Sequence, residues 1–392
     1  MEGDKHRVCS DGMRKPGDSL RQLMQNNSRL SLFMFVYLFI SGLFILKYLS
    51  RINGVAVLVA LVVFAVFVYL LWRYRTRLVR FAIPVLICYT LVFAIAVPVW
   101  FPPGTFDVDR WDMISVFSDT LLRGDYPFAA VGMTTENTPA QSPFYFVLTS
   151  PFYLTSFYVG IPLAGIWIYW LVEKYLVRMP AYTTLLIVAA PFTLYETLTC
   201  SSIFFNATIV CAWALFAVYG KRTLRFMIIH GIAGGLLLCT RNCFIIPVIM
   251  LGMALLRCDK NVKQTMIWGL TICVVFFLCY LPFVFGWGYD QWLMHNPFKV
   301  QSELILSVPL MVAIVVGAAI TSFFCKNLSD SVFFSGIWLF VACVCVLVRN
   351  ILNYEGQATI FDPQIDLTYF ILCIPFLGLS YHRNKKTEVT LC

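Results

Sequence analysis

Apolar stretches of about 20 residues recur along the whole chain, and they constrain its fold more than any other feature. A helix needs roughly 20 apolar residues to cross the ~30 Å hydrocarbon core of a bilayer. Hydrophobic residues make up 60% of the 392 residues and charged residues only 12%. A soluble domain of this size cannot bury that much apolar surface. The chain is therefore predicted to be an all-α, polytopic membrane protein.

The apolar windows predict about 12 transmembrane helices. They lie near residues 30–49, 54–72, 79–99, 160–177, 181–198, 203–219, 226–239, 243–256, 264–285, 304–323, 331–348 and 366–381. Segment 1–29 is polar and basic, without an apolar core or a small-residue cleavage site, so we expect a cytoplasmic tail rather than a signal peptide. Residues 30–381 are predicted to form a single transmembrane domain, and residues 382–392 a second cytoplasmic tail.

Basic residues in alternate connections predict which connections share a side of the membrane. If segment 1–29 is cytoplasmic, most basic connections fall on the cytoplasmic side, and the large outer loops are residues 100–142, 286–303 and 349–365. The short turn that contains Lys47 and Arg51 is the exception, because it falls outside. The agreement also requires that the aromatic, proline-broken segment 143–159 does not cross completely, so we expect an interfacial or re-entrant segment there.

The first outer loop concentrates acidic residues in an otherwise apolar chain. Six acidic residues stand against two arginines, a net charge of −4; the acids are Asp107, Asp109, Asp112, Asp119, Asp125 and Glu136. Apolar side chains recur at helical spacing from Trp111 to Leu122, and Asp109, Asp112, Asp119 and Arg123 lie largely opposite them. We therefore expect an amphipathic juxtamembrane helix on the outer surface of the membrane, ended by Gly124.

These aspartates have structural as well as functional interpretations. Asp107 could be the N-cap of the helix, and Asp109 could complement the helix dipole. For Asp112 and Asp119 we favour the wet face of an amphipathic helix. For Asp107 and Asp109 both interpretations stay open.

The first outer loop and the segment that follows it resemble a known family. The acidic start "FDVDRW", the piece "LLRGDYPF" and the return "SPFYFVLTSPFYL" resemble the GT-C-fold glycosyltransferases, in particular the polyprenol-phosphate-sugar-dependent mannosyltransferases. Asp107 matches the catalytic base of that family, Trp111 stands near its usual tyrosine, and Gly124, Pro127 and Phe128 match its Gly-x-x-Pro-aromatic piece. The match covers about 50 residues closely, and the rest of the chain only as a hydropathy profile.

The chain also departs from the family pattern. The aromatic residue is tryptophan and comes later, Phe144 replaces the second proline, and "AVGMTTENTPAQ" is inserted between the two halves. Asp109 is therefore an alternative to Asp107 as the base. The resemblance implies a catalytic transmembrane domain that transfers a sugar, mannose by analogy, from a polyprenyl-phosphate donor to a glycan, lipid or protein acceptor on the non-cytoplasmic side of the membrane.

The expected chemistry assigns roles to further residues. An inverting transfer needs one carboxylate to accept the proton of the acceptor hydroxyl, and a second carboxylate could orient the acceptor or hold a divalent cation. The sequence does not establish that a metal is needed. If a divalent cation is used, Asp107 and Asp109 are its predicted ligands. For the leaving phosphate we predict Arg241, at the tip between two short apolar spans, together with Lys299. The predicted substrate-binding residues are Arg110, Trp111, Tyr126 and His295.

Structural alternatives accompany these predictions. Arg241 could snorkel to the interface or pair with Glu196, and the tryptophans of the second outer loop could form an interfacial belt. The chain has no P-loop or GxGxxG motif, its cysteines and four histidines do not suggest zinc, and its basic residues flank apolar spans, so nucleic-acid binding is not expected. A transporter or flippase, and a polymerase or ligase of lipid-linked glycans, are the competing functional hypotheses.

Overall fold

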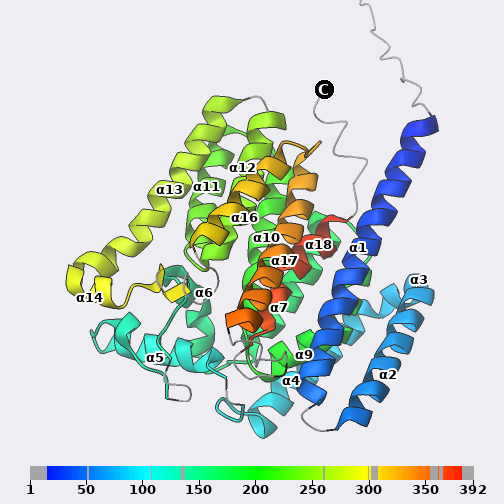
Figure 1. Ribbon diagram of the computed structural model, residues 1–392, viewed down its shortest axis with the longest axis horizontal. Helices are drawn as coiled ribbons and strands as arrows, with labels where there is room; N and C mark the ends of the chain where they lie inside the picture. Colours follow the sequence, from blue (N-terminus) through cyan, green and yellow to red (C-terminus); the bar gives the residue numbers. More distant parts are fainter. Residues whose placement is uncertain are drawn as a thin grey trace, which may run out of the picture.

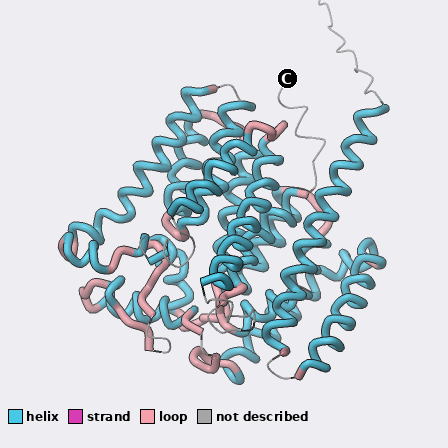
Figure 2. The backbone as a smooth tube through the Cα atoms, viewed as in Figure 1, coloured by secondary structure: helices cyan, strands magenta, loops and turns pink. Residues whose placement is uncertain are grey.

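The computed structural model describes residues 16–50, 53–106, 108–133, 137–258, 261–298, 300–301, 308–353, 361 and 365–381, with backbone only for residues 16–26 and 353. Within these ranges the regular secondary structure is helical throughout (Figure 2). This confirms the all-α prediction. Asp107, Glu136, Lys299 and the tail 382–392 lie outside the described residues.

The helices follow the predicted apolar windows closely, and their bounds are these. The first half of the chain contains α1 (Pro16–Leu49), α2 (Gly54–Arg73), α3 (Arg75–Leu78), η1 (Val79–Phe81), α4 (Ala82–Trp100), α5 (Arg110–Leu122), η2 (Pro127–Ala129), α6 (Pro143–Leu154), α7 (Gly160–Leu171), the π-helical turn η3 (Val172–Leu176), α8 (Tyr182–Ala189) and α9 (Pro191–Leu198). The second half contains α10 (Ile203–Tyr219), α11 (Leu224–Leu238), η4 (Asn242–Phe244), α12 (Ile245–Cys258), α13 (Val262–Phe285), α14 (Tyr289–Met294), α16 (Val308–Ser322), α17 (Leu328–Asn353), η5 (Thr368–Cys373) and α18 (Ile374–Ser380).

Several of these helices are long and apolar enough to cross a bilayer. In the described residues there are five such spans, Asn27–Leu49, Gly54–Arg73, Arg75–Trp100, Val262–Phe285 and Leu328–Leu352. The bent pair α9–α10 would make a sixth, and four shorter apolar segments, Leu224–Leu238, Asn242–Cys258, Val308–Ser322 and Thr368–Ser380, accompany them. The protein is a multi-pass membrane protein. The count of 12 crossings stays a prediction.

One predicted span is not a single helix. Residues 181–198 divide into α8 and α9 at Ala190, whose backbone is extended (φ −74°, ψ 135°), and α9 then meets α10 at 114°. Pro191 explains the break, because the ring of a proline disfavours helical geometry in the residue before it and begins a new helix well. The sequence prediction missed this break because hydropathy alone ignores it.

Contacts between α1 and the C-terminal part of the chain show which residues lie together at each end of the bundle. Arg29 of α1 donates to Asp330 of α17 at 2.5 Å, and Lys47 at the other end of α1 donates to the carbonyl of Ile365. Residues predicted to share a side of the membrane therefore meet, at both ends. α5 and α6 lie at the Lys47 end, the lower end of the bundle in Figure 1.

Glycine allows α11 and α13 to pack tightly together. α11 packs along α13 (Figure 1), and a Cβ on Gly235 would stand 2.7 Å from the Cβ of Val275. Small residues let transmembrane helices approach and gain dispersion contacts where the lipid offers no hydrophobic drive. This pairing fixes the start of the tip that carries Arg241.

The amphipathic helix predicted in the first outer loop is α5. Ile114 and Phe117 are buried as expected, but Leu121 and Leu122 are 39% and 74% exposed. The assignment of Asp112 to the wet face was wrong: it is 9% exposed, because the loop at Gly132 lies against its carboxylate, where a Cβ on Gly132 would stand 2.7 Å from Oδ2. Asp109, rather than Asp107, occupies the N-cap position, and its side chain makes no capping hydrogen bond.

The end of α5 is encoded by Gly124. This residue has φ +84°, which favours glycine. The amide of Gly124 donates to Leu121 and that of Asp125 to Thr120, the two hydrogen bonds of a Schellman motif. The following α6 has only 12 residues, about 18 Å at 1.5 Å per residue, so it is too short to cross.

Candidate functional site

Arg110, the first residue of α5, is held by the last apolar segment of the chain. Its guanidinium donates to the carboxylate of Asp366 and, at 2.9 Å, to the hydroxyl of Thr368. Burial disfavours the charge of Arg110, but the carboxylates of Asp366 and Asp109 outweigh it and raise the pKa of the guanidinium. Asp366 precedes the apolar segment that starts at Thr368. Burial raises its pKa, but Arg110 and hydrogen bonds from Thr368 together hold that pKa below its usual value.

Asp109 lies beside this ion pair and remains accessible. One of its carboxylate oxygens is 3.9 Å from Arg110 Nη1, and the other accepts a hydrogen bond from Asn137 Nδ2 at 3.1 Å. Its side chain is 31% exposed. Asn137 belongs to the insert that separates the two halves of the family pattern. The insert therefore contacts the candidate base.

Arg241 follows the end of α11, at the start of η4, and is almost completely buried, with 4% exposure. Its guanidinium carbon lies 5.8 Å from the ring centres of both Tyr145 and Tyr369, and its Nε has no hydrogen-bond partner. No ion pair of Arg241 occurs among the described residues. This buried cation is therefore held between aromatic rings and not by a carboxylate.

Neither structural alternative for Arg241 is observed. A snorkelling arginine would expose its charged end, and this one is buried. Glu196 is 1% exposed and uses one carboxylate oxygen to accept the amide of Phe204 at 3.0 Å, at the first turn of α10. Glu196 is therefore a cap of α10.

Hydrogen bonds from two other segments of the chain hold the tip that carries Arg241. Gln301 accepts a hydrogen bond from the amide of Asn242 at 2.9 Å and donates to the carbonyl of Ala140. The amides of Ser142 and Phe144 donate to the carbonyls of Thr240 and Cys239. The return segment of the first outer loop thus closes over the tip and seats α6, which carries Tyr145, beside Arg241.

Tyr145 and Tyr369 contact Arg241 and lie within electrostatic range of Arg110. Tyr145 shares a 2.8 Å hydrogen bond with Ser202, and Asp109, Arg110 and Arg241 all act electrostatically on the Tyr145 and Tyr369 hydroxyls. We call this group the two-arginine cluster: Asp109, Arg110, Tyr145, Arg241, Asp366 and Tyr369. It joins residues from four distant parts of the chain at one end of the bundle.

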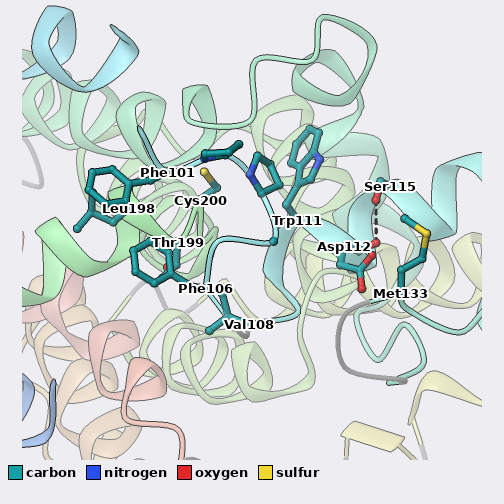
Figure 3. Close-up of a pocket in the computed structure, with 13 residues that line it drawn as sticks. Phe101, Phe106, Val108, Trp111, Asp112, Ser115, Met133, Leu198, Thr199 and Cys200 are labelled. Carbon is teal, nitrogen blue, oxygen red and sulfur yellow. Dashed lines mark hydrogen bonds between the residues drawn. The ribbon is translucent and has the colours of Figure 1, made fainter. Parts of the chain in front are cut away.

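A pocket of about 330 Å³ opens beside the cluster (Figure 3). Its walls come from the end of α4 and the following turn, from the start of α5, and from residues 198–200 in the α9–α10 bend. Val108 and Trp111, which flank Asp109 and Arg110, line it, as does the buried Asp112. Its lining is mainly apolar and aromatic, as in pockets that bind small organic groups.

The remaining predicted residues lie elsewhere. Tyr126 and His295 face each other with ring centres 6.4 Å apart, and Tyr126 borders a second pocket of about 380 Å³ at the opposite end of α5. Trp111 packs against Tyr158, with the ring centres 5.5 Å apart. The structure therefore brings Asp109, Arg110 and Arg241 together and separates Tyr126 and His295 from them. Asp107 and Lys299 lie outside the described residues.

Sequence reasoning missed Tyr145, Asp366 and Tyr369. Asp366 stood at the boundary between the third outer loop and the last predicted span, without a usable pattern around it, and the tyrosines stood in apolar segments rich in aromatic residues. Lys47 offered a signal: it was the exception to the charge rule, and the structure buries it to 2% against the carbonyl next to Asp366. A basic residue predicted on the non-cytoplasmic side therefore indicated that its charge is bonded inside the protein.

Metal ligands and relatives add no further assignment. Among the described residues no three histidine, cysteine or acidic side chains are arranged to hold a metal ion. Comparison with protein-family models, with curated proteins and with solved structures returned no match for this chain. Its chemistry has to be inferred from its own residues.

Proposed function

We propose that the protein is an integral-membrane glycosyltransferase that moves a sugar from a polyprenyl-phosphate donor to an acceptor hydroxyl. The observation that supports this most strongly is Arg241, a buried cation without a carboxylate partner in the described residues, in the same cluster as an accessible aspartate. A lipid phosphate supplies the anion that Arg241 lacks. An acceptor hydroxyl supplies the proton that Asp109 can take.

The reaction divides naturally between these two groups. The bond between the anomeric carbon and the phosphate oxygen breaks, and the electron pair leaves with the phosphate, whose growing charge Arg241 stabilises. The acceptor oxygen bonds to the opposite face of the anomeric carbon, and its proton passes to the carboxylate, so that the configuration inverts. Asp109 is the described candidate for this base, and Asp107 is the other.

The neighbourhood of Asp109 suits this role. Arg110 is engaged mainly by Asp366 and Thr368, so that Asp109 is held at 3.9 Å without a close ion pair. The pocket walled by Val108 and Trp111 is adjacent to it and fits an apolar or sugar moiety of a substrate. Mannose as the sugar follows from the family resemblance alone.

The test is to replace the candidate bases one at a time. Asp107→Asn and Asp109→Asn keep the shape and remove the basicity, and transfer of radiolabelled sugar from a polyprenyl-phosphate sugar is measured in membranes. We expect one variant to lose about 100- to 10,000-fold in rate. Asp290→Asn, an exposed aspartate of α14, is the matched control and keeps the wild-type rate. Normal rates in both candidate variants contradict the proposal.

The side of the membrane has its own test. The proposed site faces away from the cytoplasm, and Asn327 begins an Asn-Leu-Ser glycosylation sequon at the opposite, Arg29–Asp330 end. Expressed in a eukaryotic secretory host, the protein is expected to carry no glycan at Asn327. A glycan there reverses the orientation and places the site on the cytoplasmic face.

A transporter is the second candidate, because the α9–α10 bend and two buried acids resemble features of transport pathways. Both acids, however, serve neighbouring helices. Glu173 accepts hydrogen bonds from the amides and hydroxyls of Thr183 and Thr184 at the start of α8, and one oxygen of Glu196 accepts the amide of Phe204 at the first turn of α10. Both carboxylates therefore accept amides from the first turn of a helix, which is the role of a helix cap, so we favour the transferase.

A further inference from the structure

A third pocket lies at the Arg29–Asp330 end of the bundle, away from the two-arginine cluster. It measures about 300 Å³, and its walls come from four separate stretches of the chain. They include Leu30 of α1, Trp72 of α2, Arg75 of α3, Tyr182 of α8 and Tyr381 after α18. Nothing in the proposed transfer reaction uses it.

Three side chains in contact, Arg75, Trp72 and Tyr182, build the polar part of this pocket. The guanidinium of Arg75 lies 4.6 Å from the ring of Trp72 and donates to the Trp72 carbonyl at 3.3 Å. The other neighbour of Trp72 is Tyr182, whose ring meets it edge-on at 5.9 Å. The position of the charge is thus fixed by packing, and Arg75 makes no ion pair within the part of the chain that the structure describes.

Tyr182 provides an independent sign of a ligand. Its side chain is 6% exposed and lines the pocket, and its hydroxyl has no hydrogen-bond partner. A buried hydroxyl left unpaired is unfavourable, so such groups normally face a partner. The charge of Arg75 acts on this hydroxyl, so the donor and the cation converge. Glu173 acts electrostatically on Tyr381, but its oxygens are held by Thr183 and Thr184.

We propose that this pocket binds the phosphate of an anionic membrane lipid, with Arg75 as its counter-charge and the Tyr182 hydroxyl as its hydrogen-bond donor. The two non-bridging oxygens of a phosphodiester can bind these two groups at once, one oxygen at the exposed Arg75 guanidinium and the other at the buried Tyr182 hydroxyl. The apolar walls at Leu30 and Val79 suit the glycerol and first methylene groups of a lipid better than a free ion. The site lies at the end of the long helices, at the level of lipid head groups.

The test titrates the purified full-length protein in detergent with phosphatidylglycerol, phosphatidylcholine or inorganic phosphate and counts bound lipid by native mass spectrometry. We expect phosphatidylglycerol to bind at least about fivefold more tightly than phosphatidylcholine, and millimolar phosphate not to displace it. Arg75→Gln is expected to remove that preference. Tyr182→Phe, which keeps the ring and the fold, weakens phosphatidylglycerol about tenfold.

Arg225→Gln is the matched control, because it removes an equally exposed charge from a different connection, at the start of α11. It leaves the preference for phosphatidylglycerol unchanged. Equal binding of the two lipids by the wild type overturns the proposal, as does equal loss in the Arg75 and Arg225 variants. Displacement of the lipid by inorganic phosphate shows a free-anion site and overturns the assignment to a lipid.

Discussion

Two buried arginines at opposite ends of the bundle differ in one respect. Arg29 and Arg241 are 6% and 4% exposed, and both lie near aromatic rings, Arg29 at 4.8 Å from Phe333. Arg29 has its own carboxylate, Asp330, at 2.5 Å. Arg241 has none among the described residues.

Under the proposed function, the difference separates a structural charge, Arg29, from one that binds a ligand, Arg241. A buried charge without a partner is unfavourable by at least ~2.5 kcal/mol, and a fold that only needed packing at this position would place an apolar residue there. Arg29 is neutralised within the protein and joins α1 to α17. We infer that Arg241 is neutralised by an anion from outside the chain. Changes at the two arginines are therefore expected to have opposite effects. Loss of the Arg29 ion pair lowers stability, and loss of Arg241 lowers ligand binding.

The largest expected effect is on the paired arginine. Asp330→Asn leaves Arg29 buried without its counter-charge, and we expect the free energy of unfolding in mixed detergent micelles to fall by about 3–5 kcal/mol. Sugar transfer per folded molecule stays at the wild-type level, because this pair is remote from the two-arginine cluster. An unchanged stability would show that buried charge pairs do not matter here and would remove the basis of the comparison.

A smaller effect is expected at the second ion pair. Asp366→Asn removes one partner of Arg110, and the stability is expected to fall by about 1–3 kcal/mol, since Asp366 is 31% exposed and Thr368 still binds Arg110. Arg110 then turns to Asp109 and makes it a weaker base, so the transfer rate falls as well. A variant with reduced stability and full activity would exclude the role given to Asp366.

The same pair predicts an acid-sensitive contribution to stability. The folded pKa of Asp366 lies below its usual value of about 3.9, so its contribution is complete above that value and is lost as the pH falls through the folded pKa. Thermal unfolding of wild type and Asp366→Asn between pH 7 and pH 3 measures it. The difference between the two proteins should shrink toward acid pH; a constant difference contradicts the assignment.

The smallest expected effect is at the rings beside Arg241. Tyr145→Phe removes the hydrogen bond to Ser202 but keeps the ring, so we expect a loss of about 1 kcal/mol in stability and little change in donor affinity. Tyr145→Leu also removes the ring that faces Arg241 and is expected to weaken the donor. Equal donor affinities in the two variants would show that the ring does not position Arg241.

Much of the fold follows from local sequence properties. Apolar windows of helical length predict where the long helices lie, and Gly124 predicts the end of α5, because both signals reside in a few adjacent residues. The break at Ala190 was within reach, since Pro191 marks it. The burial of Asp112 and the exposure of Leu122 were not, because they depend on which other segments cover α5.

The site was predictable only in part for the same reason. Asp109, Arg110 and Arg241 were identified from an acidic cluster, a family pattern and a pair of short spans. Their partners Asp366, Tyr145 and Tyr369 come from segments up to about 260 residues away, and a single sequence contains no signal for such pairings. The exceptional placement of Lys47 was the one indirect clue.

The most direct measurement compares how a lipid phosphate and its alcohol stabilise the protein. Farnesyl phosphate and farnesol differ only in the phosphate, and thermal unfolding of the purified protein reports the binding of each. We expect farnesyl phosphate to stabilise the wild type and Arg75→Gln more than farnesol does. Arg241→Met, which is expected to fold at least as stably as the wild type without ligand, should respond equally to both. A full phosphate-dependent stabilisation of Arg241→Met would contradict the assignment of Arg241 to the donor phosphate.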